Sequence, residues 1–381
     1  MDKINELLTR GIANIIPSAP QLKELLQSGR KLNIYWGIDP TSVHVHLGNA
    51  THLRRLQRLA ELGHNVTLLI GNFTALIGDT SDKDSERPVL TKDQIEANWQ
   101  TYKSQAEKVV DFSLVHIRHN SEWLEKLSFE DIVKLCQQFS LNDFISRELI
   151  KKRLNSGGSV RLDETLYPIM QGYDSYFMNT DLQIGATDQT FNMQAGRALQ
   201  KKLRAKESFI LVGNFLEGTD GRKMSKSWGN AIWLDDSPDE MFGKVMSVKD
   251  DLIDQYFLLA TNLDQDEFPD DKHPMEQKKK LAWQIVSELH SPTLADQAQK
   301  HFESTFQDRE TPTDVPTYHL QQKRPLTEIL VATGLAKSKS AARRLVEQQG
   351  VKLNGDTVTE PDSNVDSGDM IKVGRRFVKL T

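Results

Sequence analysis

Apolar and polar positions along the first 70 residues follow two different periods, and their order predicts a parallel α/β sheet. The run LNIYWGI (32–38) is short and apolar, as in a buried strand, and NVTLLIG (65–71) is a second run of this kind. Between them, HLGNATHLRRLQRLAELG (46–63) has apolar residues at helical spacing and ends in glycine. Strand, helix and strand in this order are typical of a doubly wound fold.

The same alternation continues to about residue 215. Further strands are predicted near LQIGATDQ (182–189) and at FILVGN (209–214), and helices over 92–110 and 130–153 are predicted to form an insertion within the sheet. The chain before the first strand is expected to be helical. The fold class is therefore α/β, with a Rossmann-like parallel sheet and a mostly helical insertion.

The remainder of the chain changes character twice. Helical spacing without a strand signal runs from 237 to 306, and a polar, proline-containing segment follows. The last 57 residues combine two helical patterns with VKLNGDTV, whose Asn-Gly pair between apolar residues indicates a hairpin. We expect a sheet domain with its insertion, a helical domain, a linker and a small α+β domain, at 1–232, 233–308, 309–324 and 325–381.

Composition narrows the class of protein. Charged residues make up 27% of the 381 and the net charge is −5, as in an ordinary soluble protein. From residue 323 onward, however, 11 Lys and Arg face 7 Asp and Glu, which favours a tail that contacts nucleic acid. The single cysteine, Cys136, excludes an intramolecular disulfide and a Cys-rich zinc site. With no signal-like start and no apolar window of membrane-spanning length, we expect a cytoplasmic protein without membrane contact.

Two short segments carry candidate chemistry. In GTDGRKMSKSWGN (218–230), Lys223 and Lys226 lie among serines and glycines. Such a run is usually a solvated loop, but a flexible loop with two ammonium groups also suits closure on a polyphosphate. His46 and Gly48 lie at the predicted start of the helix after the first strand, where backbone N–H groups can face a phosphate. Both segments in one chain therefore indicate a nucleotide site; His44 alone is interpreted as an exposed or capping side chain.

The order of these motifs resembles that of class I aminoacyl-tRNA synthetases. HLGN (46–49) resembles the HIGH motif of that class, and KMSKS (223–227) matches its second motif in full. Nearly the whole chain is similar to the tyrosyl-tRNA synthetase family, through YWGIDPT (35–41) and through the YxxxQxxD spacing of LYPIMQGYD (166–174). The segment SKSAARRLVEQQGVKLNG (338–355) is similar to an S4 RNA-binding domain.

This resemblance implies a ligase that activates L-tyrosine with ATP, releases pyrophosphate, and transfers the tyrosine to the 3′-terminal adenosine of tRNA(Tyr). It implies Mg²⁺ with the ATP and neither a prosthetic group nor a metal held by the protein alone. It also implies a homodimer through the helical insertion. The sheet domain would be catalytic, the helical domain would contact tRNA, and the last domain would bind RNA.

The resemblance also assigns roles to individual residues. Asp174 and Tyr35 would meet the phenolic hydroxyl, for which a carboxylate is a suitable acceptor. The expected tyrosine-binding residues are Tyr35, Thr74, Asp79, Tyr167, Gln171, Asp174 and Gln189. The expected ATP-binding residues are Gly37, Asp39, His46, Gly48, Asn49, Thr51, Asp188, Lys223 and Lys226. The expected catalytic residues are His46, Asn49, Lys83, Arg87, Lys223 and Lys226. The expected RNA-binding residues are Lys337, Lys339, Arg343 and Arg344.

The sequence departs from the family pattern in places, and other functions stay open. Asn49 replaces the second histidine of HIGH, and Thr80 and Asp82 replace a proline and a glycine in the loop that carries Lys83 and Arg87. Asn120 and Trp123 resemble a family element beside the pocket, although a buried tryptophan is more often part of a core. The alternatives are a tryptophanyl-tRNA synthetase, a nucleotidyltransferase acting on a small molecule, and a synthetase-derived RNA-binding protein without catalysis.

Overall fold

The chain divides into two compact units, residues 1–302 and 303–381, which are described separately. The structure is a computed structural model. It describes residues 3–79, 90–225, 228–269, 273–307, 316–320, 322–361, 363–374 and 376–381.

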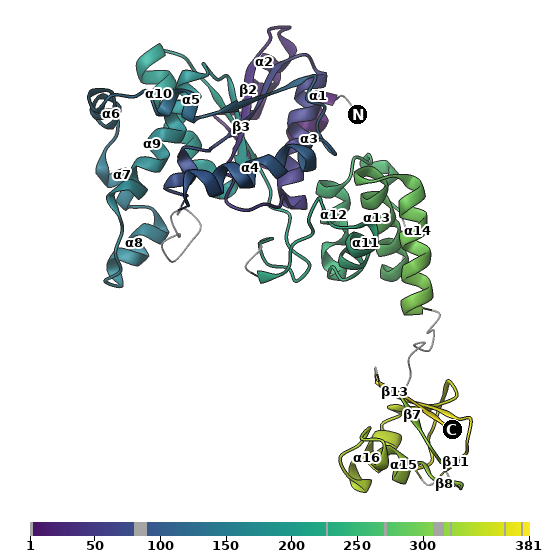
Figure 1. Cartoon of the computed structure of the whole chain (residues 1–381). Helices are drawn as coiled ribbons and strands as arrows, with labels where there is room; N and C mark the ends of the chain where they lie inside the picture. The colour runs from purple at the N-terminus through teal and green to yellow at the C-terminus, as the bar shows by residue number, and fades with distance from the viewer. Residues whose placement is uncertain are drawn as a thin grey trace. The chain divides into compact units, whose positions relative to one another are not determined.

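A six-stranded sheet forms the centre of the first unit (Figure 1). Its strands are β1 (Ile12–Ile16), β2 (Asn33–Ile38), β3 (Asn65–Ile70), β4 (Val115–His119), β5 (Leu182–Ala186) and β6 (Phe209–Gly213), in the order β1-β6-β5-β2-β3-β4. All neighbours are parallel except β1, which runs antiparallel to β6. Because the strand order reverses beside β2, a crevice forms where the carboxyl ends of β2 and β5 meet.

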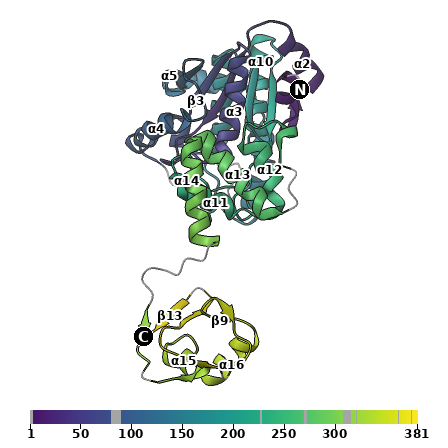
Figure 2. The same ribbon diagram turned by 90° about the vertical axis from the view of Figure 1, so that its right-hand side faces the viewer.

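Helices cover the sheet and extend beyond it (Figures 1 and 2). Those up to the last parallel strand are α1 (Lys3–Thr9), α2 (Ala19–Gln27), α3 (Leu47–Glu61), α4 (Lys92–Ala106), α5 (Ser121–Leu124), α6 (Phe129–Cys136), α7 (Leu141–Ile145), α8 (Glu148–Asn155), α9 (Leu162–Phe177) and α10 (Thr190–Arg204). The later ones are α11 (Pro238–Met246), α12 (Ile253–Ala260), α13 (Pro274–Leu289) and α14 (Pro292–Phe302). The parallel sheet and the helical run after it confirm the predicted fold class.

Three local predictions were wrong. The opening region is not wholly helical, because Ile12–Ile16 forms β1 on the edge of β6, about 200 residues away in sequence. Val115–His119 was not predicted as a strand and forms β4 on the other edge. In both cases the hydrogen-bonding partner is distant, so local spacing does not reveal the strand. The helix predicted over 130–153 is instead three short helices, α6 to α8, and Ser140, at the start of α7, is one of the residues between them.

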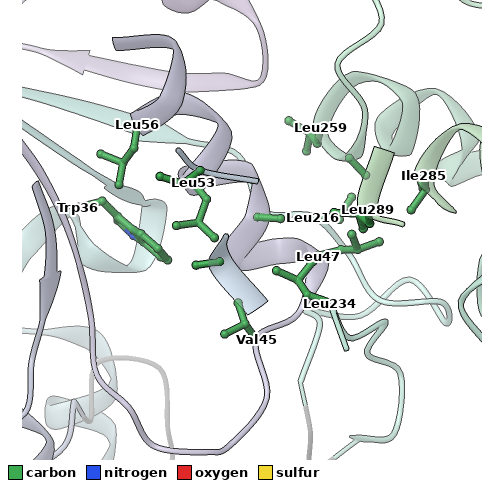
Figure 3. Packing of buried hydrophobic residues seen from close by; sticks show 14 of the residues in the cluster. Trp36, Val45, Leu47, Leu53, Leu56, Leu216, Leu234, Leu259, Ile285 and Leu289 are labelled. Atoms are coloured by element: carbon green, nitrogen blue, oxygen red, sulfur yellow. The ribbon is translucent and has the colours of Figure 1, made fainter. Parts of the chain in front are cut away.

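Helix α3 connects the sheet to the later helices. Figure 3 shows Leu53 and Leu56 of α3 near Trp36 of β2, and Leu47 near Leu234. All five side chains are at most 6% exposed. One hydrophobic core therefore runs from the sheet through α3 to α11–α14, and the boundary predicted at residue 232 falls inside a compact unit.

The second unit is a small α+β domain. Its sheet has the order β10-β9-β12-β13-β7, from β10 (Asp356–Thr357), β9 (Val351–Leu353), β12 (Met370–Val373), β13 (Arg376–Leu380) and β7 (Thr317–Tyr318). The helices α15 (Leu326–Ala332) and α16 (Lys339–Glu347) and the pair β8 (Arg324–Pro325) and β11 (Asn364–Val365) complete it.

The predicted hairpin is confirmed, because Asn354 and Gly355 both have positive φ between β9 and β10. The predicted linker, in contrast, is partly ordered. Its residues 317–318 form β7, which pairs with β13.

Candidate active site

A cavity of about 1150 Å³ opens at the carboxyl ends of the central strands, beside the start of α3. Fourteen of the expected site residues line it, although they are spread from strand β2 to the loop after β6. They are Tyr35, Gly37, Asp39, His46, Gly48, Asn49, Thr74, Asp79, Tyr167, Gln171, Asp174, Asp188, Gln189 and Lys223.

The remaining expected residues do not appear in that lining. Thr51 is 3% exposed, and its hydroxyl donates to the Gly48 carbonyl within α3 (2.9 Å), so the structure does not bring it to the cavity. Lys83, Arg87 and Lys226 lie outside the described residues, as do Thr80 and Asp82.

His46 is the N-cap of α3 and closes the first turn through a reciprocal pair of hydrogen bonds. The Asn49 backbone N–H donates to His46 Nδ1, and the His46 backbone N–H donates to Asn49 Oδ1, each at 3.2 Å. Because Nδ1 accepts, the ring proton lies on Nε2. Burial, and then the charge of Lys223, lower the pKa of His46 to about 4. The imidazole is therefore neutral at physiological pH, with Nε2–H as its donor.

The segment that carries Lys223 is joined to the start of α3. The Leu47 backbone N–H donates to the Ile232 carbonyl, and that of Leu234 donates to the Val45 carbonyl, so residues 231–234 lie alongside residues 45–47. Met224 is 3% exposed and packs into the main core. This arrangement places the lysine segment and the helix start in one local structure.

Lys223 forms an ion pair across the cavity wall. Its Nζ lies 2.9 Å from Asp188 Oδ2 and 5.0 Å from the centre of the Phe215 ring. The other carboxylate oxygen, Asp188 Oδ1, is buried and accepts no hydrogen bond from the described residues. A cation and an acceptor are thus held together where a charged substrate can separate them.

Asp174 is a buried carboxyl group with two donors. It is 2% exposed, its Oδ1 accepts from Trp123 Nε1 (2.7 Å), and its Oδ2 accepts from Asn120 Nδ2 (3.2 Å). Burial outweighs these bonds and raises the pKa of Asp174 to about 8. Tyr35 is close enough for Asp174, after burial, to raise the pKa of its hydroxyl further. The element around Asn120 and Trp123 is therefore part of the site, not only of the core.

A chain of hydrogen bonds extends from this carboxyl group toward β2. Asn120 Nδ2 also donates to Thr74 Oγ1 (3.0 Å), and Thr74 donates to Asp39 Oδ1 (2.8 Å). The Tyr167 hydroxyl donates to Asp39 Oδ2 (3.0 Å). These contacts fix the orientation of Asp39, which faces the cavity after the end of β2.

A second carboxylate, Asp79, is held by two side-chain amides. Gln189 Nε2 donates to Asp79 Oδ2 at 2.6 Å and Asn192 Nδ2 donates to the same oxygen at 3.3 Å. Asn192 also donates to Gln189 Oε1 (3.1 Å). Gln171 lines the same cavity from α9. The cavity therefore holds three oriented acidic side chains, at positions 39, 79 and 174, together with neutral amides.

Comparison with known proteins decides the family. The family model for class I tRNA synthetases of the tryptophan and tyrosine type matches residues 27–307, and the S4 domain model matches 324–371. A tyrosine–tRNA ligase of Dehalococcoides mccartyi is 40% identical over 98% of this chain and 97% of its own length. A tyrosine–tRNA ligase of Thermotoga maritima is 36% identical over 97% and 95%. The chain belongs to the tyrosyl-tRNA synthetase family.

Solved structures of tyrosyl-tRNA synthetases share the fold. A C-terminally truncated mitochondrial enzyme of Aspergillus nidulans superposes with a TM-score of 0.66 at 20% identity, over 80% of this chain and 94% of that one. An Archaeoglobus fulgidus enzyme complexed with L-tyrosine gives 0.60 at 20% identity, over 78% and 98%. At this identity the likeness concerns the architecture of the first unit.

Sequence reasoning missed several residues of this tyrosyl-tRNA synthetase site. Gln183 is fully buried in β5 and accepts from the Tyr35 hydroxyl (3.1 Å), and a polar residue inside an apolar strand was the available signal. Asn192 lies three residues after Gln189, on the same helical face. Trp233 lines the cavity with its ring 6.0 Å from that of His46, and nothing local indicated this.

The four expected RNA-binding residues are all exposed in the S4 domain, around α16. Lys339 Nζ pairs with Glu328 Oε1 at 2.8 Å, while Arg376, near the end of the chain, donates to the Gly334 and Leu335 carbonyls. Arg375 lies outside the described residues. The exposed group is Lys337, Lys339, Arg343 and Arg344.

Proposed function

We propose that the chain activates L-tyrosine with ATP and then transfers the tyrosine to the 3′-terminal adenosine of tRNA(Tyr). In the first step a carboxylate oxygen of tyrosine attacks the α-phosphorus of ATP, and the bond to the bridging oxygen of pyrophosphate breaks. A carboxylate needs no deprotonation at neutral pH, so the protein must align the reactants and stabilise charge. In the second step a ribose hydroxyl of the terminal adenosine attacks the carbonyl carbon of the adenylate and AMP leaves.

The observation that carries the proposal is the buried Asp174 beside Tyr35. A phenol O–H entering this region meets a carboxyl oxygen, while the Tyr35 hydroxyl, which donates to Gln183, keeps its oxygen available as an acceptor. Phenylalanine brings no donor and leaves a buried acceptor without a partner. An indole N–H would meet Asp174 with a ring of different shape, and the listed relatives favour tyrosine.

The other acidic side chains support recognition of the amino-acid group. Asp79 and the Tyr167–Asp39–Thr74 chain supply oxygens for the substrate ammonium, and Gln171 lines the same wall. Gln189, whose amide nitrogen contacts Asp79, can turn toward the substrate carboxylate.

The start of α3 and the lysine segment support ATP binding. His46 would donate from Nε2 to a phosphate oxygen, and Lys223 would leave Asp188 for the phosphates, which frees Asp188 for a ribose hydroxyl. Gly48 leaves no room for a side chain, because an added Cβ would lie 2.9 Å from His46 Nδ1. Asn49 would contact the ribose or phosphate. Lys83, Arg87 and Lys226 stay predictions about the pyrophosphate, and Thr51 stays a prediction about the ribose.

Mg²⁺ is part of the proposal as a companion of ATP. Among the described residues no group of three or more His, Cys, Asp or Glu side chains could hold a metal ion. This donor set does not fit a magnesium site made by the protein alone, so the ion would take its ligands from phosphate and water. The steps above are therefore assigned to protein side chains only.

The S4 domain supports a role in tRNA binding, because exposed cations beside a helix can neutralise phosphates. The helical domain, 233–308, is proposed to contact the same tRNA. Among the described residues, no helix is long and apolar enough to cross a membrane. A cytoplasmic location is proposed because tRNA is the substrate.

A homodimer through the helical insertion is part of the same proposal. Large apolar side chains are exposed on the insertion, at Phe129 (82%), Leu162 (78%) and Leu141 (61%). Exposed apolar groups of this size favour a protein–protein contact. Sedimentation of the wild type and of Phe129→Asp tests it: we expect a dimer that the substitution weakens, and a monomeric wild type would contradict it.

Amino-acid-dependent ATP–pyrophosphate exchange tests the activation step. We expect exchange with tyrosine and a far lower rate with phenylalanine or tryptophan. Exchange driven by tryptophan would replace the proposed substrate. No exchange from a folded protein that still binds tRNA would favour the non-catalytic alternative.

A further inference from the structure

His52 is a buried histidine on α3 with one ring nitrogen unpaired. It is 6% exposed, and its Nδ1 lies 3.3 Å from Arg55 Nη1. A guanidinium only donates, so Nδ1 is the acceptor and the ring proton lies on Nε2. Among the described residues Nε2–H has no hydrogen-bond partner, yet it is not fully covered, unlike the unpaired Nε2 of His64 and of His290.

The open nitrogen belongs to the cavity of the active site. His52 lines that cavity and lies three residues after Asn49, on the same face of α3. Its ring stacks on Trp36, with ring centres 5.2 Å apart and planes at 24°. Trp36 and Tyr35 are neighbours on β2 and point to opposite faces of the sheet. His52 therefore lies on the same side as His46, whose charge acts on it, and away from the Asp174 face.

Arg55 determines what this donor can do. The guanidinium is buried, donates to the Gly11 carbonyl (2.8 Å), and together with burial lowers the pKa of His52 well below its ordinary value. The imidazole is thus a neutral donor of fixed tautomer. A neutral donor of this kind suits an uncharged acceptor, such as a ribose oxygen or an adenine nitrogen, better than a phosphate, for which His46 and Lys223 are available.

We propose that His52 Nε2–H donates a hydrogen bond to the adenosine part of ATP, which makes it a further substrate-binding residue. The inference rests on the proposed activation of an amino acid with ATP. The stack on Trp36 and the bond from Arg55 hold the ring so that Nε2 faces the cavity.

Two isosteric variants separate binding from a purely structural role. The amide nitrogen of Gln reaches the place of Nε2, and the amide oxygen of Asn reaches the place of Nδ1. His52→Asn keeps the acceptor for Arg55 and loses the cavity donor, whereas His52→Gln keeps the donor. In tyrosine-dependent exchange we expect His52→Asn to raise the KM for ATP roughly three- to tenfold, the range for one hydrogen bond, with the KM for tyrosine unchanged. His52→Gln should recover most of this loss.

Nucleotide analogues identify the acceptor. With 2′-deoxyATP, 3′-deoxyATP and the 1-, 3- and 7-deaza analogues, we expect one analogue for which wild type and His52→Asn become equal. A loss that persists with every analogue overturns the inference, as does an Asn variant that binds ATP better than the Gln variant.

Thermal unfolding of both variants accompanies the assay. If the Asn variant does not fold, a folded Gln variant that binds ATP more than tenfold more weakly than wild type also overturns the inference. Wild-type protein that shows no exchange with tyrosine would instead refute the proposed function.

Discussion

Replacing Asp174 with asparagine changes the charge of a buried group with almost no change of shape, and the structure predicts a distinctive pH dependence. Burial raises the pKa of this carboxyl group from 3.8 to about 8. Between these two values the unfolded chain releases the proton while the folded chain keeps it. Stability is therefore complete below pH 3.8, falls as the pH rises through this window, and is level above about pH 8.

The magnitude follows from the width of the window. Each pH unit within it lowers the free energy of unfolding by about 1.4 kcal/mol, so the wild type at pH 7 loses about 4 kcal/mol relative to acid. Asparagine does not titrate, and its Nδ2 would face the donor of Asn120 at every pH. The difference in unfolding free energy, Asp174→Asn minus wild type, should therefore rise by about 3 kcal/mol from pH 5 to pH 7.

Urea denaturation of both proteins at pH 5, 6, 7, 8 and 9 measures this difference. Asp131→Asn provides a control of opposite sign. Hydrogen bonds from Ser128 lower the pKa of the exposed Asp131, so the stability it contributes is lost as the pH falls. A difference for Asp174→Asn that stays constant from pH 5 to pH 8 would refute the reasoning.

The same variant also tests recognition of the substrate. In wild type, phenylalanine leaves the Asp174 acceptor unpaired, at a cost of about 1–3 kcal/mol. Asparagine presents a donor as well as an acceptor and weakens that contrast. The ratio of kcat/KM for tyrosine over phenylalanine should fall by roughly 10- to 100-fold, mainly through the loss of tyrosine. An unchanged ratio would place the phenol elsewhere.

Three further substitutions test other parts of the account. Lys223→Met should lower kcat for pyrophosphate exchange roughly 100- to 1000-fold while tyrosine binding, measured by calorimetry, stays the same; a loss under threefold would contradict a role at the phosphates. Arg54→Met leaves the carboxylate of Glu288 without its buried partner at 2.7 Å, and urea denaturation should show a loss of about 3–5 kcal/mol, whereas under 1 kcal/mol would deny the pair its role. Lys337→Ala with Arg344→Ala should weaken tRNA binding and reduce the slope of its salt dependence by about 2, with exchange unaffected; unchanged affinity would exclude this surface.

The sequence predicted those parts of the site that lie on short continuous segments. HLGN follows a recognisable strand and opens a helix, and the lysine segment is a continuous motif, so their positions follow from local pattern. The spacing of Tyr167, Gln171 and Asp174 placed these residues on one helical face, and all three line the cavity. Local pattern fails where the partner is distant, as for β1 and β4.

The electrostatic state of the site could not be predicted in this way. Asp174 depends on Trp123 and Asn120, about 50 residues earlier in the chain, and its raised pKa depends on complete burial. The neutral state of His46 likewise depends on burial and on Lys223, 177 positions away. Such properties arise from packing between segments that no sequence period connects.

The most direct test of the central claim is the charging of a tRNA(Tyr) transcript by the purified chain with ATP and labelled tyrosine, tryptophan or phenylalanine in parallel. The account predicts label on the 3′-terminal adenosine with tyrosine, and little or none with the other two amino acids. Charging with tryptophan, or no charging of a tRNA that the folded protein binds, would contradict it.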